Sequence, residues 1–371
     1  MNKNVLVLTN NIGGLHSFRK EVMKAILDSG YKVTISYPDF DERASYFEGI
    51  GCKMVHTPFN RRGMNPIKDL SLLMTYIKLI QMVKPIVVLT YTIKSNIYGG
   101  IACRFCKVHQ LANVTGLGDA IENGGLLSKI ALGLYRFGIK KAKVFFQNSA
   151  NRTFCIKQGI VSEDAILLPG SGVNLLYHTY QEYPKDNDTK FLFIARLLKD
   201  KGTMEYFEMA KYIRDKYPQT EFQILGPCEG NFEKELGCLV ENKYINYLGT
   251  TSDVRPYIAS AHCTVMPSYH EGLSNVNLES SANGRPVITT NVSGCRETVD
   301  DGITGFTCDA KSVDALKEAV EKFINLPYEE KKKMGVAARN KVEREFSRQI
   351  VVDVYLNEIN RISIEQNYDN T

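Results

Sequence analysis

Residues 263–291 read CTVMPSYHEGLSNVNLESSANGRPVITTN, and the pattern in this stretch decides the fold. The apolar run at 263–268 predicts a buried strand, and Gly272 follows it at a turn. Residues 275–283 then carry apolar side chains at helical spacing among polar ones. A second apolar strand is predicted at 286–291. A strand, a helix and a further strand in this order predict a parallel α/β sheet.

Two acidic residues, Glu271 and Glu279, lie on either side of the predicted junction between the first strand and the helix. Glu271 is expected at the carboxyl end of the strand, the edge at which open parallel sheets bind ligands. Glu279 is expected within the helix. The backbone N–H groups of the first helical turn, around Leu273, Ser274 and Asn275, are predicted to hold a phosphate with help from the helix dipole.

The same alternation of strand-like and helix-like segments extends in both directions along the chain, which predicts parallel, doubly wound sheets. The further predicted strands are residues 5–10, 32–38, 85–91, 144–148, 165–173, 191–196, 221–227 and 244–250.

A chain of 371 residues suits two domains. We predict an α/β fold of two facing Rossmann-like domains, at residues 1–180 and 186–349, joined through the polar stretch 181–190. The carboxyl ends of both sheets are expected to face an interdomain cleft. Residues 350–371, which show helical spacing, are expected to pack back onto the first domain.

Composition narrows the class of protein. With 44% hydrophobic and 23% charged residues, the chain is typical of a soluble globular protein. The N-terminus reads as a first strand and not as a secretory signal, and no uncharged apolar run is long enough to predict a membrane-spanning helix. The nine cysteines, including a lone pair at Cys103 and Cys106, fit reduced thiols in the cytoplasm better than disulfides or a metal site.

Charge is divided unevenly between the halves. Residues 1–185 contain 23 Lys and Arg against 12 Asp and Glu, a net charge of +11, whereas residues 186–371 contain 23 against 29, a net charge of −6. A basic first half indicates an anionic acceptor or an anionic membrane surface, although a solvated basic face would look the same. Nucleic acid is not expected as a partner, because no nucleic-acid-binding motif is present and the second half is acidic.

Cations and glycines lie where the predicted strands end. Arg196 closes a strand and Lys201 precedes a helix, so the two could neutralise a diphosphate, although two solvated surface charges would also fit. Gly13 and Gly14 follow the first strand, before a helix expected to begin near Ser17, and would let backbone approach a phosphate. An ordinary tight turn is the alternative. The spacing is not G-x-G-x-x-G, which disfavours a dinucleotide-dependent oxidoreductase.

Taken in order, the motifs resemble the retaining glycosyltransferases of family 4, also called group 1, which have the GT-B fold. The motifs are ARLLKDKG at 195–202, HEGLSNVNLE at 270–279, NGRPVI at 283–288, GCRE at 294–297 and DGITGF at 301–306. The resemblance implies a nucleotide-sugar donor, with UDP as the expected nucleotide, held mainly by the second domain, and no other cofactor.

The resemblance also implies a role for each matching residue. Arg196 and Lys201 would grip the donor diphosphate, Glu279 would bind the ribose hydroxyls, and Glu271 would contact the donor sugar. The remaining donor-site positions are Gly13, Gly14, Gly226, Pro227, Gly249, Gly272, Leu273, Ser274 and Asn275. Ser274 stands where the family often has Pro, and Ser280 and Ser281 stand where small apolar residues are usual, so the donor sugar stays open.

The first half is similar to a subset of these enzymes that extend undecaprenyl-diphosphate-linked sugars in bacterial polysaccharide or glycan assembly. The matching segments are SFRK at 17–20, NRRGMNP at 60–66, TIKSNIYGG at 92–100 and NVTGLGD at 113–119. The acceptor-binding residues implied are His16, Arg19, Arg61, Arg62 and Lys94. The basic amphipathic segment 126–143 is expected to lie in a membrane interface on the inner face of the cell membrane, with ordinary core packing as the alternative.

No residue reads as a convincing nucleophile, which favours a front-face, metal-independent transfer of a hexose or N-acetylhexosamine with retention. Two D-x-D triplets, at 39–41 and 186–188, are interpreted as a turn and a linker and not as a metal site. Two other functions remain open: a nucleotide-sugar epimerase on the same fold, and a noncatalytic glycan-binding protein.

Overall fold

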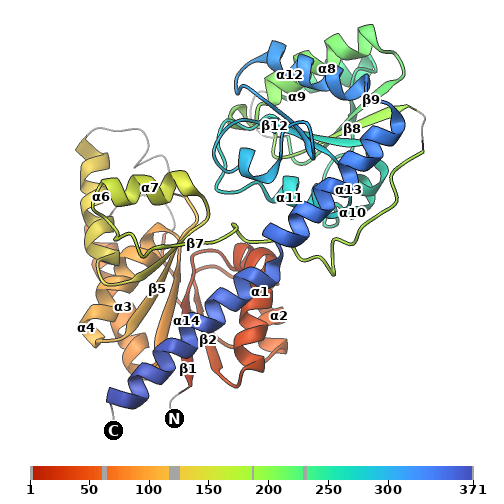
Figure 1. Ribbon diagram of the computed structural model, residues 1–371. Helices are drawn as coiled ribbons and strands as arrows, with labels where there is room; N and C mark the ends of the chain where they lie inside the picture. The colour runs from red at the N-terminus through yellow and green to blue at the C-terminus, as the bar shows by residue number, and fades with distance from the viewer. Residues whose placement is uncertain (1–2, 61–64, 117–125, 186–187, 229–231, 370–371) are drawn as a thin grey trace. The chain divides into compact units, whose positions relative to one another are not determined.

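The computed structural model describes residues 3–60, 65–116, 126–185, 188–228 and 232–369. The chain divides into two compact units (Figure 1). Unit 1 is Met1–Ser171 together with Gln349–Thr371, and unit 2 is Gly172–Arg348.

Unit 1 contains a seven-stranded parallel sheet in the order β3-β2-β1-β4-β5-β6-β7. The strand order reverses between β1 and β4, which makes their carboxyl ends the topological switch point of the sheet. The strands are β1 (Asn4–Leu8), β2 (Lys32–Tyr37), β3 (Lys53–His56), β4 (Val87–Tyr91), β5 (His109–Val114), β6 (Lys143–Phe146) and β7 (Ile166–Leu167). The helices are α1 (Ile12–Asp28), α2 (Ala44–Gly49), α3 (Pro66–Val83), the π-helical turn η1 (Ser95–Gly99), α4 (Gly100–Cys106), α6 (Leu126–Ile139), α7 (Ser149–Lys157) and α14 (Arg348–Asp369).

Helices cover both faces of this sheet, so its strands are apolar on both sides. Val5 and Val7 of β1 belong to one core cluster, and Leu6 and Leu8 belong to another, as the alternation of side chains along a strand requires. Helix α14 runs along the first of these faces (Figure 1), where its buried residues, Tyr355 among them, join the cluster of Val5 and Val7.

Unit 2 contains a six-stranded parallel sheet in the order β10-β9-β8-β11-β12-β13, with its switch point between β8 and β11. The strands are β8 (Thr189–Ile194), β9 (Thr220–Leu225), β10 (Asn246–Tyr247), β11 (Cys263–Met266), β12 (Val287–Thr290) and β13 (Gly305–Cys308). The helices are the short turn η2 (Lys199–Lys201), α8 (Thr203–Lys216), α9 (Glu233–Glu241), α10 (Arg255–Ser260), α11 (Asn275–Ala282), the short turn η3 (Arg296–Thr298), α12 (Val313–Ile324) and α13 (Tyr328–Glu345).

The predicted fold class is confirmed, because both sheets are parallel and doubly wound. The local boundaries differ in places. Three strands were not anticipated: β3 and β13, which lie at sheet edges, and β5, which lies inside the unit 1 sheet. Strand β10 is reduced to Asn246–Tyr247. Helix α1 begins at Ile12 and not near Ser17, because the Asn11 side chain caps it by accepting from the Gly14 N–H.

The segment before β8 groups with unit 2, although residues up to 180 were expected in the first domain. Arg285, which is fully buried, holds this segment in place. Its guanidinium donates to the carbonyl oxygens of Gln181 (3.0 Å) and Glu182 (2.7 Å), and also to that of Ala259 (2.8 Å). A buried cation surrounded by carbonyl oxygens keeps its hydrogen bonds without an acidic partner.

Candidate functional site

The predicted donor-site residues of unit 2 follow four neighbouring strands. Arg196 comes two residues after β8, Gly226 directly after β9, Gly249 after β10 and Glu271 after β11. Because these strands are parallel and lie in the order β10-β9-β8-β11, the four positions line one edge of the sheet. Along that edge they follow the order Gly249, Gly226, Arg196 and Glu271. Arg196 is exposed there.

An ion pair lies at the switch point. Lys201 Nζ is 2.7 Å from Glu271 Oε1, and each side chain keeps 19% of its surface exposed. The same Glu271 oxygen accepts a hydrogen bond of 3.0 Å from the hydroxyl of Ser268, which is fully buried. The two residues that sequence analysis assigned to diphosphate and sugar are therefore in contact, and Ser268 orients the carboxylate.

Close backbone packing holds this ion pair in place. Gly202 follows Lys201 in the left-handed region, with φ of 72°, and a Cβ there would lie 2.2 Å from the Pro267 carbonyl oxygen. Gly294 has φ of 86°, and a Cβ there would lie 2.3 Å from the Glu271 carbonyl oxygen. Both contacts require glycine, so the loops that carry Lys201 and Glu271 are clamped together by positions that cannot accept a side chain.

The first turn of α11 offers fewer free donors than expected. The Ser274 N–H already donates to the Gly294 carbonyl oxygen at 2.7 Å, so it is not available to a phosphate. The Ser274 side chain is instead the N-cap of α11 and accepts from the Asn277 N–H. In the described chain the N–H groups of Leu273 and Asn275 have no protein acceptor. Those two amides remain candidates for binding an anion.

Glu279 lies on α11 and is half-buried. Burial raises the pKa of its carboxyl group to about 7, and the nearby positive charge of Arg348 opposes this only in part. Neither carboxyl oxygen has a hydrogen-bond partner among the residues that the structure describes. Glu279 is therefore a carboxyl group with unused hydrogen-bonding capacity.

The glycines of unit 1 lie at its own switch point. Gly13 and Gly14 are in the first turn of α1, directly after β1. A Cβ on Gly13 would lie 2.2 Å from the Arg43 guanidinium, which sequence analysis did not single out. Arg43 pairs with Asp41 (2.7 Å), the second carboxylate of the first D-x-D triplet.

The predicted acceptor residues have different surroundings. Lys94 Nζ is 2.9 Å from Asp69 Oδ1, so its charge is already neutralised by a largely buried carboxylate. His16 packs edge-on against the ring of Tyr46 at 4.9 Å, and burial lowers the pKa of its imidazole. Arg61 and Arg62 lie outside the described residues.

Arg19 requires a correction. Its side chain is 3% exposed, with its guanidinium 5.9 Å from the ring of Tyr91 and 6.0 Å from that of Tyr355. It packs between the sheet and α14 and is not a solvent-facing cation for a lipid diphosphate. The sequence carried no signal for the contact between Arg19 and Tyr355, because the two residues lie at opposite ends of the chain, on α1 and α14.

Within the described ranges, no group of three or more His, Cys, Asp or Glu could hold a metal ion. The second D-x-D triplet falls partly on residues that the structure does not describe. In the described chain we also found no helix with the length and apolar character needed to cross a bilayer.

Comparisons with known proteins now identify the family. The protein-family model described as glycosyl transferases group 1 matches residues 180–341. A second family model, described as glycosyl transferase 4-like, matches residues 5–149. This chain belongs to the group 1 glycosyltransferases. Like known glycosyltransferases it has the GT-B fold, as the resemblance implied.

This group 1 glycosyltransferase is similar to three further proteins, among others. It is 25% identical to the N,N'-diacetylbacillosaminyl-diphospho-undecaprenol alpha-1,3-N-acetylgalactosaminyltransferase of Campylobacter jejuni, over 94% of this chain and 96% of the relative. A glycosyltransferase structure from Rickettsia africae superposes with a TM-score of 0.81 at 19% identity, covering 97% of this chain and 98% of the other. Anabaena HepE in complex with UDP superposes with a TM-score of 0.79 at 16% identity, covering 96% and 99%.

Proposed function

We propose that this group 1 glycosyltransferase moves a hexose or N-acetylhexosamine from a UDP-sugar to a lipid-diphosphate-linked sugar, with retention and without a metal ion. The observation that carries the proposal is the contact of Lys201 with Glu271 at the switch point of the unit 2 sheet. The name of the Campylobacter relative supports the acceptor class, and the UDP in the HepE structure supports the nucleotide.

The donor would lie along the carboxyl edge of the unit 2 sheet. Gly226 has φ of 142°, and a Cβ there would lie 2.0 Å from the Ala195 carbonyl oxygen, so the loop after β9 packs directly on the loop after β8. The backbone at Gly226, Pro227 and Gly249 would frame the base. Glu279 would accept hydrogen bonds from the ribose hydroxyls.

The diphosphate would then lie at β8, where Arg196 and Lys201 supply positive charge. As the bond from the anomeric carbon to the diphosphate oxygen breaks, negative charge grows on the leaving phosphate. Lys201 can stabilise that charge while keeping its contact with Glu271, because an ammonium group has three donors. The pair thus presents a cation to the phosphate and a carboxylate to the hydroxyls of the donor sugar.

Glu271 is poorly suited to act as a nucleophile. Its Oε1 already accepts from Lys201 and Ser268. These contacts lower the electron density available for attack and fix the carboxylate as a hydrogen-bond acceptor. We therefore favour a front-face step, in which the acceptor hydroxyl attacks the anomeric carbon from the side that the diphosphate leaves and a phosphate oxygen takes the proton.

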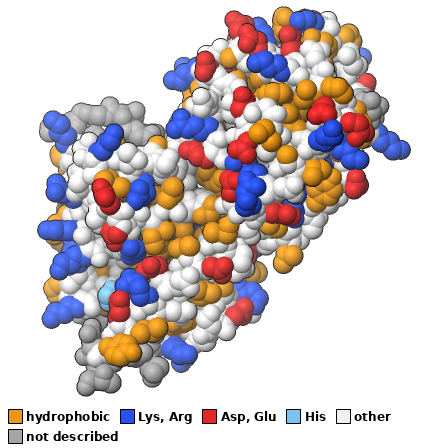
Figure 2. Space-filling model, viewed as in Figure 1, with side chains coloured by type: hydrophobic (Ala, Val, Ile, Leu, Met, Phe, Trp, Pro, Cys, Tyr) orange, Lys and Arg blue, Asp and Glu red, His pale blue; other side chains and the backbone are white. Residues whose placement is uncertain are grey.

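The acceptor side would involve unit 1, the basic half of the chain. Figure 2 shows Lys and Arg side chains along the side of unit 1 that carries α4 and α6. An acceptor with a lipid tail would place the protein at the inner face of the cell membrane as a peripheral protein. Gly13, Gly14, His16 and Lys94 stay predicted ligands of the donor phosphates or the acceptor.

A panel of UDP- and GDP-sugars, each tested with and without a polyprenyl-diphosphate-linked sugar, tests the function. Release of nucleotide only when the acceptor is present supports transfer. Interconversion of the donor sugar without acceptor would support an epimerase instead. Saturable binding with no turnover for any pair would support a noncatalytic protein, and either of these last results would contradict our proposal.

A further inference from the structure

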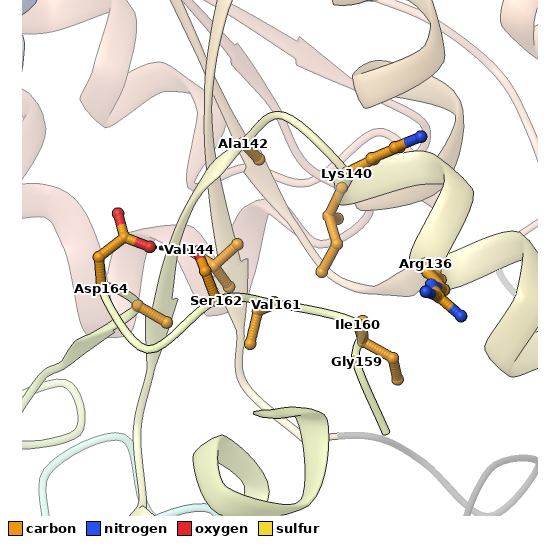
Figure 3. Close-up of a pocket in the computed structure, with 11 residues that line it drawn as sticks. Arg136, Lys140, Ala142, Val144, Gly159, Ile160, Val161, Ser162 and Asp164 are labelled. Carbon is orange, nitrogen blue, oxygen red and sulfur yellow. Dashed lines mark hydrogen bonds between the residues drawn. The ribbon is translucent and has the colours of Figure 1, made fainter. Parts of the chain in front are cut away.

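A cavity of about 320 Å³ lies at the amino edge of the unit 1 sheet (Figure 3). Two of its lining residues, Ala142 and Ala165, directly precede β6 and β7. The glycines after β1 and Lys94 after β4 are at the carboxyl edge of the same sheet. This amino-edge pocket is therefore separate from the positions at which unit 1 is expected to meet the reacting substrates.

The pocket has a positively charged side. Arg136 and Lys140, one helical turn apart at the end of α6, lie on the side of the pocket opposite Ser162 and Asp164, with the Lys140 ammonium directed away from the other lining residues (Figure 3). Within the described parts of the chain, neither Arg136 nor Lys140 has an acidic partner within ion-pair distance. The single acidic lining residue, Asp164, is bound by Lys143 at 2.9 Å and by the Ser162 hydroxyl. The unmatched charge of the pocket is thus positive.

The shape of the pocket restricts what can enter. Gly159 has φ of 63°, and a Cβ there would lie 3.7 Å from the Arg136 guanidinium, so the missing side chain leaves the guanidinium open to the cavity. None of the lining residues is aromatic, so a nucleobase has no ring to stack on. The volume is at the small end for ligand pockets and suits a phosphoryl group with a glycerol-sized substituent.

The outer face of α6 links this pocket to a lipid surface. Its exposed residues recur at helical spacing and combine apolar with basic side chains: Lys129, Ile130, Gly133, Arg136, Phe137 and Lys140. Ile130 and Phe137, seven positions and therefore about two helical turns apart, lie on the same face and are 48% and 56% exposed. Such a face suits the boundary between head groups and acyl chains.

We propose that the amino-edge pocket binds a phosphoryl group through Arg136, with the charge of Lys140 at the pocket rim, as carried by an anionic phospholipid head group or by free phosphate. An arginine fork and a lysine are the side chains that bind phosphate best, and here they lack competing acids. The inference goes beyond the proposed transfer reaction. Binding can be read without turnover, so the two proposals can fail separately.

The test compares two double variants of the full chain that lose the same charge. The pocket variant carries Arg136→Gln and Lys140→Gln, which remove the two cations at the pocket. The control variant carries Lys32→Gln and Lys53→Gln, which remove two exposed lysines at the starts of β2 and β3. Binding of glycerol 3-phosphate and of inorganic phosphate is measured by calorimetry. Binding to phosphatidylglycerol and to phosphatidylcholine vesicles is measured by co-sedimentation.

If the ligand is a lipid head group, the pocket variant should lose saturable phosphate binding. Its affinity for phosphatidylglycerol vesicles should also fall at least tenfold further than that of the control variant. If phosphate binding is lost but both variants lose vesicle affinity equally, the ligand is free phosphate. Gly159→Asn, which keeps the charge and tolerates a positive φ, should weaken phosphate binding by filling the cavity. The proposal is overturned if wild-type protein shows no saturable phosphate binding, or if the pocket variant binds phosphate as wild type does.

Discussion

The raised pKa of Glu279 leads to a measurable dependence of stability on pH. Burial raises the pKa of this carboxyl to about 7 in the folded protein, from a reference value of 4.5. Because the folded-state pKa is the higher one, the stabilising contribution is complete below the unfolded pKa and is lost as pH rises through the folded pKa. The window in which stability falls is therefore roughly pH 4.5 to 7.

The magnitude follows from these two values. A difference of this size between the folded and unfolded pKa values corresponds to roughly 3 kcal/mol, most of which is lost between pH 5 and pH 8. For a unit of this size, that change corresponds to roughly 5–10 °C in melting temperature. Glu279→Gln keeps the shape of the side chain and removes its titration.

The assay is chemical or thermal unfolding of the full chain from pH 5 to pH 8. The free energy of unfolding of Glu279→Gln, relative to wild type, should rise with pH by roughly 2–3 kcal/mol over this range. The control is Glu318→Gln, an exposed carboxylate on α12 of the same unit, whose curve should run parallel to that of wild type. Parallel curves for Glu279→Gln and wild type would refute the reasoning.

The same carboxyl predicts a proton release when UDP binds. Ribose hydroxyls that donate to Glu279 favour its ionised form and lower its pKa, so binding near pH 6.5 should release a proton. Calorimetry in two buffers of different ionisation enthalpy measures that proton. Glu279→Gln should bind UDP more weakly and without the release, and an unchanged release in the variant would mean that another group supplies the proton.

Three further predictions concern other contacts. Lys201→Met should lower kcat by roughly 100- to 1,000-fold, because a donor aimed at the leaving phosphate is lost. The control is Lys199→Met, a change at an exposed neighbouring lysine that should leave kcat near wild type. Equal losses of kcat in the two variants would contradict the assignment. Arg285→Met should destabilise the protein by about 2–4 kcal/mol, because several buried carbonyl oxygens lose their donor, and denaturant unfolding measures this. Tyr355→Phe should cost about 1 kcal/mol, because its hydroxyl donates to the buried Asn113 side chain, and an unchanged unfolding midpoint would contradict the bond.

Local sequence patterns were sufficient for the fold class and for most of the elements at the donor edge. The apolar runs that became β8, β9 and β11 are followed within a few residues by Arg196, Gly226 and Glu271, and in a parallel sheet the ends of such strands must share one edge. The alignment of Arg196, Gly226 and Glu271 along that edge follows from the period of the pattern alone. The family resemblance pointed to the same residues.

Element ends and short strands were less predictable. Helix α1 begins at Ile12 because a single side chain, that of Asn11, caps it, and the apolar spacing does not report this. Strand β10 spans only two residues, although the apolar run that contains it is longer, because sheet pairing and not residue type sets its length.

By itself, the sequence determined two parallel α/β sheets, the residues at their ligand edge and a basic first half, because these depend on spacing and composition. Only the tertiary structure decided that Lys201 contacts Glu271, 70 positions away, that Arg19 is buried beneath α14, and that Glu279 has a raised pKa. It also decided that Arg136 opens into a pocket. Contact, burial and solvation depend on which distant segments pack together, and no local pattern records that.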